Sequence, residues 1–406
     1  MKDAATMRIF TAIPSPFLQH WQPDAHFFSR DMGLTCHALR EFGVESRVVM
    51  PRGPTTKEHP DIVRTTLAEM GDPDWWLQFS LDGVVFCSWA DPKYTPIAKA
   101  IKNSGAKLIL RCDSGGAYSQ WQVNPFQALS RNYLAARYRN KTPLAALVYS
   151  LVKTPAFYIP ALYERKVVEH MALADVILNE TPEGVRLLKA LLCRYGRMET
   201  AARVLYVPHP VAGEMRYAES IPKDNQIIAV GNWEHHAKNA PLLIRSLAGF
   251  LEQALEYHAV IFGLGSELLK KYCSSLSDPL IQRIQIRGRV ANSDLMPEYQ
   301  RSKIYFAPSR SESFNIAGAE ALSCGCSFVG RSSIFSFQNF VSRNSGTLAC
   351  RYSVDGMVEA LATESMAWKG GLRNPARISS LWYNEVSRSA VASAILMALR
   401  GPKGVI

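Results

Sequence analysis

Two glutamates eight positions apart, Glu312 and Glu320, have the greatest potential for chemistry in this sequence. They follow a strand-like run, and the segment between them opens a helix near Asn315, so Glu312 falls in the turn and Glu320 on the helix. A carboxylate in the turn can accept hydrogen bonds from sugar hydroxyls, and one on the helix can accept both hydroxyls of a ribose. Two isolated glutamates would more often be a helix cap and a solvated helix residue, so the surrounding pattern decides between these interpretations.

The start of that helix is a candidate anion site. The first backbone N–H groups of a helix have no intrahelical acceptor, and the helix dipole favours negative charge there. The residues concerned are Ser313, Phe314, Asn315, Ile316 and Ala317. Together with the two glutamates, these amides would hold the phosphates of a nucleotide-sugar whose two ends are held by the carboxylates.

Two series of alternating strands and helices must position these residues. Short apolar strands are expected at 8–14, 44–50, 84–87, 107–110, 174–178 and 204–207, then at 227–231, 258–262, 284–286, 304–306 and 327–329. This rhythm predicts an α/β fold with two doubly wound, Rossmann-like domains that face a cleft, with ligands beyond the carboxyl ends of the strands. The expected boundaries are a first domain at 1–207, a linker at 208–225, a second domain at 226–375, and a final helical segment at 376–406 that packs back towards the first domain.

Composition excludes several classes of protein. The 406 residues have 48% hydrophobic and 20% charged side chains, which is typical of a globular chain. No apolar stretch is long enough to span a membrane, and the start lacks the apolar core of a secretory signal. The eight cysteines show no zinc-binding spacing, which favours free thiols in a reducing cytoplasm. The net charge of +11 fits nucleic acid, an anionic membrane surface or a phosphorylated substrate.

The sequence resembles a known family. The pattern Glu312-Ser-Phe-Asn…Glu320-Ala-Leu-x-x-Gly325 is similar to the signature of retaining glycosyltransferases of the GT-B fold, most nearly glycosyltransferase family 4. The resemblance covers roughly residues 204–330 and includes the segments at 207–211, 230–239, 261–268 and 286–299.

The resemblance implies roles for further residues of the second domain. Lys238 would bind the donor diphosphate, whereas Asn232 stands after Gly231 where the family usually has Arg, so donor affinity depends on another cation such as His235, His236 or Arg310. At Gly263 and Gly265, the two glycines of a tight turn, the backbone would approach the donor closely. Arg289 and Val290 would flank the nucleobase.

The first domain departs further from the family. Asp113 stands where many relatives have a His near the transferred sugar, and the segment 15–21 replaces a glycine-rich loop. Asp113 could orient the sugar or the acceptor hydroxyl, or it could be a strand-end turn residue. The expected catalytic set is Glu312, Lys238 and Asp113, with no metal and no cofactor.

The resemblance implies transfer of a hexose from a nucleoside-diphosphate sugar, UDP- or GDP-linked, to a glycan or lipid-linked acceptor, as in polysaccharide or cell-envelope biosynthesis. The aromatic and basic stretch 121–166 could contact the inner face of the cell membrane, or it could form solvated helices beside the acceptor. It matches no nucleic-acid-binding module. The alternatives are a non-catalytic nucleotide-sugar or glycan-binding protein on the same fold, and a sugar-phosphate synthase or epimerase.

Overall fold

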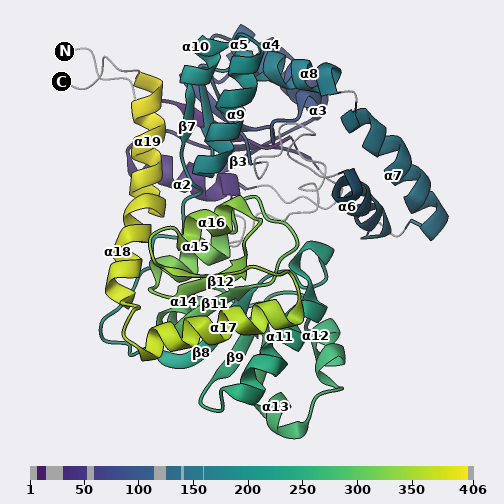
Figure 1. The fold of residues 1–406 in the computed structure, drawn as a ribbon. Helices are drawn as coiled ribbons and strands as arrows, with labels where there is room; N and C mark the ends of the chain where they lie inside the picture. The colour runs from purple at the N-terminus through teal and green to yellow at the C-terminus, as the bar shows by residue number, and fades with distance from the viewer. Residues whose placement is uncertain are drawn as a thin grey trace. The chain divides into compact units, whose positions relative to one another are not determined.

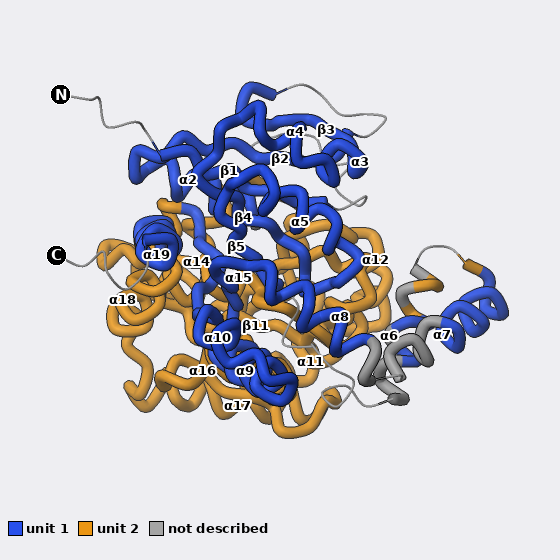
Figure 2. The backbone as a smooth tube through the Cα atoms, turned by 90° about the horizontal axis from the view of Figure 1, so that it is seen from above, with its two compact units in different colours: residues 1–133, 142–212, 387–406 blue, residues 134–141, 213–386 orange. Residues whose placement is uncertain are grey.

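The computed structural model describes residues 7–14, 31–52, 59–113, 125–138, 141–158 and 160–400, and the segment 15–21 lies outside these ranges. The chain forms two compact units, which Figure 1 shows as ribbons and Figure 2 distinguishes by colour. Unit 1 comprises residues 1–133, 142–212 and 387–406, and unit 2 comprises residues 134–141 and 213–386. None of the helices in the described ranges combines the length and the apolar character that crossing a membrane requires.

Unit 1 is built on a seven-stranded parallel sheet with the order β3-β2-β1-β4-β5-β6-β7. The strands are β1 (Ile9–Ala12), β2 (Val48–Pro51), β3 (Ile62–Thr65), β4 (Gly83–Cys87), β5 (Lys107–Arg111), β6 (Val176–Asn179) and β7 (Val204–Tyr206). Nearly every strand residue is buried, because helices cover both faces of a parallel sheet. One face packs against α5 (Thr95–Asn103), α8 (Pro160–Ala172) and α9 (Pro182–Arg194), and the other against α2 (Asp31–Glu41) and α19 (Arg388–Arg400).

The C-terminal helical pattern consists of two helices. The sequence predicts one final helical segment at 376–406, whereas the structure has α18 (Pro375–Val386) in unit 2 and α19 in unit 1. Ser387 interrupts them, and its hydroxyl accepts a hydrogen bond from the N–H of Ala390 at 3.2 Å, which starts a new helix in the manner of an N-cap. The apolar face of α19 packs into the same core as Ile9 and Leu39.

Unit 2 contains a six-stranded parallel sheet with the order β10-β9-β8-β11-β12-β13. The strands are β8 (Asp224–Val230), β9 (His258–Phe262), β10 (Ile284–Gly288), β11 (Ser302–Ala307), β12 (Ser327–Arg331) and β13 (Gly346–Ala349). The helices of this unit are α11 (Ala240–Gln253), α12 (Ser266–Cys273), α13 (Asp278–Gln282), α14 (Asn292–Arg301), α15 (Ile316–Ser323), α16 (Phe335–Val341), α17 (Val354–Lys369) and α18. The predicted fold class of two doubly wound parallel sheets is confirmed, with β3 and β13 as edge strands that the sequence did not indicate.

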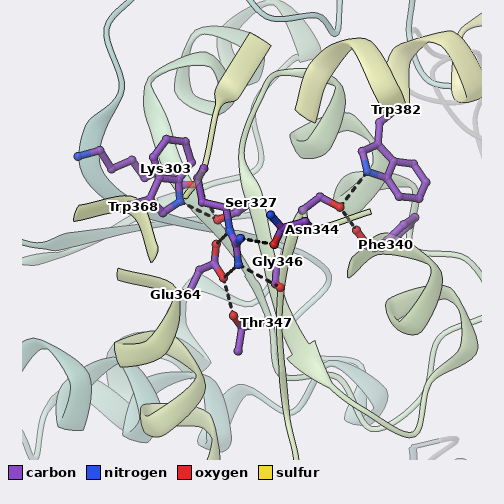
Figure 3. Close-up of polar contacts among 11 residues, drawn as sticks. Lys303, Ser327, Phe340, Asn344, Gly346, Thr347, Glu364, Trp368 and Trp382 are labelled. Carbon is purple, nitrogen blue, oxygen red and sulfur yellow. Dashed lines mark hydrogen bonds and ion pairs between the residues drawn. The ribbon is translucent and has the colours of Figure 1, made fainter. Parts of the chain in front are cut away.

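A buried ion pair between Arg373 and Glu364 holds β13 in unit 2. Figure 3 shows the Glu364 carboxylate beside Thr347 of β13. The guanidinium of Arg373 donates to both carboxylate oxygens of Glu364 on α17, at 2.6 and 2.9 Å, and Thr347 of β13 donates to the same carboxylate at 2.6 Å. The side chains of Arg373 and Glu364 are 6% and 0% exposed. Because each polar group is satisfied, the network can hold charge inside the unit at acceptable cost.

Candidate functional site

The strand order of unit 2 reverses between β8 and β11, and the loops after these two strands carry the principal candidate residues. In a doubly wound sheet the carboxyl ends at such a switch point are where ligands bind. The β8 loop (231–239) supplies Lys238 and the β11 loop (308–315) supplies Glu312. The ammonium of Lys238 lies 2.6 Å from Oε1 of Glu312, so the fold brings together two of the three predicted catalytic residues.

Local backbone geometry places Lys238. The residue ends a short 3₁₀ turn (His236–Lys238), and Asn239 then adopts a left-handed conformation with φ of 56° before α11 begins. The aliphatic stem of Lys238 lies against Gly231, where an added Cβ would be 3.4 Å from Cδ of the lysine. Arg310 joins the two loops, because its N–H donates to the carbonyl of Ala237 at 2.7 Å.

Glu312 is held by three donors. Besides Lys238, the hydroxyl of Ser309 donates to Oε1 at 2.6 Å, and the side-chain amide of Asn315 lies 3.5 Å from the same oxygen. The side chain of Glu312 is 11% exposed. Ser309 is a residue that sequence reasoning missed, although its position two residues after β11 is where such a donor would be expected.

The expectation that a helix opens near Asn315 is confirmed. Asn315 has φ of 73°, a conformation that Asn tolerates better than most residues, and its side-chain oxygen accepts the N–H of Gly318 at 2.9 Å. Phe314 anchors the turn through a ring contact with Phe340 at 5.4 Å between centroids. The N–H groups of the first turn of α15 therefore project from the carboxyl end of β11, next to the Lys238–Glu312 pair.

Glu320 lies on α15 as predicted, but its side chain is buried, which excludes the interpretation as a solvated helix residue. The hydroxyl of Tyr299 on α14 donates to Oε2 of Glu320 at 3.3 Å. Burial and the nearby Glu320 carboxylate raise the pKa of Tyr299 well above its usual range, so the phenol stays protonated as a donor. Sequence reasoning missed Tyr299, because its contact depends on how α14 packs against α15.

The two glycines of the β9 loop bring a second backbone segment against the β8 loop. Gly263 and Gly265 have φ of +114° and +93°, and a Cβ at Gly263 would collide with the carbonyl oxygen of Gly231. The N–H of Gly263 also donates to the carbonyl of Gly288 at 2.7 Å, which ties this loop to the end of β10. Arg289 and Val290 follow directly, so all candidate residues of unit 2 lie after four neighbouring strands.

The structure reduces the number of residues that could supply the positive charge that Asn232 lacks. The side chain of Asn232 accepts the N–H of Glu234 at 3.2 Å and so stabilises a turn. His235 and His236 are stacked with ring centroids 4.8 Å apart. Burial, with Lys238 beside His235 and Arg310 near His236, lowers the pKa of each imidazole below its usual range, so both are neutral at neutral pH. Of the three side chains considered, Arg310 is the one that stays charged.

Arg310 is held by neutral partners. Its guanidinium donates to the side-chain oxygen of Asn239 at 3.1 Å, and Asn239 donates to the hydroxyl of Tyr352 at 2.7 Å. Among the described residues no carboxylate pairs with Arg310, and its side chain is exposed. Its charge is therefore available to an anionic ligand in the immediate neighbourhood of Lys238.

Asp113 belongs to unit 1, where it follows β5. Its Oδ1 lies 3.3 Å from Nε2 of His209, which follows β7, and the two side chains are 14% and 2% exposed. The sequence did not predict this pair, although both residues follow strands whose carboxyl ends lie at one edge of the sheet. Within the described ranges, no group of three or more His, Cys, Asp or Glu side chains is placed to hold a metal ion.

Comparison with known proteins gives a consistent result. Residues 213–363 match the family described as Glycosyl transferases group 1. HepE from Anabaena, solved in complex with UDP and glucose, has a TM-score of 0.63 at 12% identity, over 97% of this chain and 99% of that one. Sucrose-phosphate synthase from Thermosynechococcus elongatus has a TM-score of 0.62 at 12% identity, over 97% and 98% of the two chains.

WaaG, a glycosyltransferase involved in lipopolysaccharide biosynthesis, has a TM-score of 0.57 at 13% identity, over 98% of this chain and all of that one. No curated protein shows significant sequence similarity to the chain. The structural likenesses show that the chain has the GT-B fold. Within unit 2, residues 213–363 are similar to the glycosyl transferases group 1 family.

Proposed function

We propose that this protein transfers a hexose, with retention of configuration, from a nucleoside-diphosphate sugar to a hydroxyl of a glycan or lipid-linked acceptor. The observation that carries the proposal is the Lys238–Glu312 pair, 2.6 Å apart, beside the N-terminus of α15 at the switch point of unit 2. A cation, a hydroxyl-binding carboxylate and free helix amides are the three groups that a sugar diphosphate requires.

In the proposed complex, the diphosphate draws the ammonium of Lys238 away from Glu312. The backbone N–H groups of Ile316 and Ala317 donate hydrogen bonds to the phosphate oxygens, and Arg310 supplies the second positive charge. Glu312, still held by Ser309, then accepts hydrogen bonds from the sugar hydroxyls. These groups are fixed before the donor arrives, so they stabilise charge on the leaving diphosphate with little reorganisation and without a metal ion.

Glu320 completes the proposed donor site of unit 2, and Asp113 of unit 1 has a separate proposed role. Glu320, oriented by Tyr299, would accept hydrogen bonds from the ribose hydroxyls. Asp113 would orient the transferred sugar or the acceptor hydroxyl, and His209 would hold the Asp113 carboxylate in place. The nucleobase would lie against Arg289 and Val290. We favour UDP as the nucleotide, because HepE, which shares the fold, was solved with UDP and with UDP-glucose.

We also propose that the reaction takes place in the cytoplasm, at the membrane face where cell-envelope and polysaccharide acceptors are assembled. All eight cysteines are free thiols, two of them exposed, which is compatible with a reducing compartment.

The test measures donor binding and turnover separately. UDP-, GDP-, ADP- and dTDP-sugars are compared for their effect on the melting temperature, because a ligand that binds the folded state stabilises it. Release of the nucleoside diphosphate is then followed with an extract of acceptors. Glu320→Ala is expected to lose most donor affinity, whereas the control Glu252→Ala, an exposed glutamate of α11, keeps it. A Glu320→Ala protein with full affinity and full transfer rate would refute the site.

One observation favours a second function. Asn232 in place of an arginine removes a bidentate phosphate contact, which would suit a protein that binds a nucleotide-sugar without transferring it. Calorimetric binding of a donor, together with no release of nucleoside diphosphate for any acceptor tried, would support this alternative.

A further inference from the structure

Helix α7 (Pro143–Tyr158) of unit 1 exposes a row of large aliphatic side chains. Leu144, Leu147, Val148, Leu151 and Val152 are 72%, 44%, 52%, 51% and 69% exposed. In Figures 1 and 2 the helix lies at the periphery of unit 1. The described aromatic side chains of the stretch, Tyr133, Tyr149 and Tyr163, are half-buried, so the exposed apolar surface is aliphatic rather than aromatic.

The five aliphatic residues form one continuous face. At 3.6 residues per turn they fall within an arc of about 140° on the helix surface. The fully buried residues Ala146 and Ser150 lie on the opposite side. The helix therefore packs through its small residues and leaves its large apolar residues outward, which is the reverse of a core helix.

Such a face is unusual on a globular protein. The other exposed large hydrophobic residues of the described ranges, such as Leu255, Met366 and Met397, are scattered, whereas five are gathered on α7. Single exposed apolar residues are normal, but a contiguous patch marks a surface that another body covers. A shallow hollow on the helix is lined by Thr142, Leu144, Ala145, Val148, Tyr149 and Val152.

The charged residues near this face indicate what kind of partner covers it. From 141 to 169 the sequence has four basic residues and two acidic residues, Glu164 and Glu169. The carboxylate of Glu164 is buried and bonded to Tyr195 and Arg194, so it adds little negative charge to the surface. Arg165, Lys166 and Glu169 are exposed on α8, the next helix. An apolar face in a segment with more exposed basic than acidic residues is complementary to an anionic lipid bilayer, which offers acyl chains below negatively charged head groups.

We infer that α7 docks unit 1 onto an anionic bilayer by lying in the interface, with Leu144, Leu147, Val148, Leu151 and Val152 among the upper acyl chains. The helix has 16 residues and does not cross the membrane. Docking would place the enzyme where a lipid-linked acceptor is found. That consequence, but not the docking itself, rests on the proposed function.

The experiment is co-sedimentation of the full chain with phosphatidylglycerol-rich vesicles and with pure phosphatidylcholine vesicles. The α7 variant is Leu144→Gln with Leu147→Gln and Leu151→Gln. The matched control is Leu255→Gln with Met366→Gln and Leu372→Gln, three exposed apolar residues of unit 2. We expect the wild type and the control to bind the anionic vesicles and the α7 variant to bind about tenfold less or worse. Arg165→Gln with Lys166→Gln should weaken binding to the anionic vesicles and make that binding less sensitive to salt.

Three results would overturn the inference. The first is that the wild type does not bind anionic vesicles, and the second is that the α7 variant binds them as well as the wild type does. The third is a wild-type dimer that becomes monomeric in the α7 variant without any vesicle binding, since a second copy of the chain would then cover the face. The UDP-induced rise in melting temperature is recorded for every variant. An unchanged rise shows that the α7 variant is folded. Vesicle binding without any effect of the UDP-, GDP-, ADP- and dTDP-sugars would refute the proposed function while leaving the docking intact.

Discussion

Replacing Lys238 by alanine should separate the two roles of this lysine. In the structure its ammonium lies 2.6 Å from the Glu312 carboxylate, and the side chains of Lys238 and Glu312 are 23% and 11% exposed. In the proposed complex it binds the diphosphate. A hydrogen bond to a charged group contributes about 1.5–3 kcal/mol, so Lys238→Ala should weaken UDP binding by about 10- to 150-fold.

The same change leaves Glu312 nearly buried, with Ser309 as its principal remaining donor. We expect a loss of about 1–3 kcal/mol in the free energy of unfolding, which is less than the cost for a fully buried pair because both side chains keep some contact with solvent. Calorimetry with UDP measures the first effect and urea unfolding measures the second.

Adding Glu312→Gln to Lys238→Ala removes the uncompensated charge. The double variant should recover most of the lost stability without recovering UDP affinity, because the diphosphate still lacks its cation. Lys270→Ala, an exposed lysine paired with Glu267 in the same unit, is the control and should change neither quantity. UDP affinity of Lys238→Ala within about twofold of the wild type would refute the assignment of this lysine to the diphosphate.

Three further changes test other parts of the structure. Arg310→Ala should weaken UDP binding by about tenfold. Adding Asn232→Arg to this variant should restore binding, because a second cation would again stand beside the diphosphate. Calorimetry that shows no rescue would assign Arg310 to another role. Arg373→Met should lower the free energy of unfolding by about 3–5 kcal/mol because Glu364 is left as a buried charge, and a loss below about 1 kcal/mol in urea unfolding would contradict this. Burial lowers the pKa of His170 from 6.5 to about 4, so the folded state favours the neutral imidazole. The neutral imidazole contributes about 3 kcal/mol of stability above pH 6.5, and this contribution is lost as the pH falls towards 4. Urea unfolding should find this pH dependence reduced in His170→Gln.

The sequence predicted those parts of the site that depend on local order along the chain. Asn315 opens its helix where the polar turn ends, and Glu312 and Glu320 take the expected positions before and on α15. Lys238 and Glu312 are 74 residues apart, yet they meet because each follows a strand and the two strands are neighbours in a parallel sheet. Periodicity and strand order thus account for the outline of the donor site.

The remaining features depend on packing that no local pattern encodes. The edge strands β3 and β13 were not predicted, because an edge strand needs apolar side chains on fewer sides and β13 is half-exposed over most of its length. Tyr299 reaches Glu320 only through the contact between two helices. The outward face of α7 has the same i, i+3, i+4 spacing as a core helix, so the pattern alone does not indicate which side is covered.

The arrangement of α19 has a consequence for the order in which the protein forms during synthesis. Unit 2 is complete once residue 386 has been made, whereas unit 1 still lacks residues 387–406 at that point. Until α19 arrives, the surface around Ile9, Ile13 and Leu39 lacks the residues Val391, Ile395 and Leu399 that complete its core. The half of the chain that emerges first from the ribosome is therefore expected to be the last to reach its final stability, and the nascent first unit is the state that a chaperone would have most reason to bind.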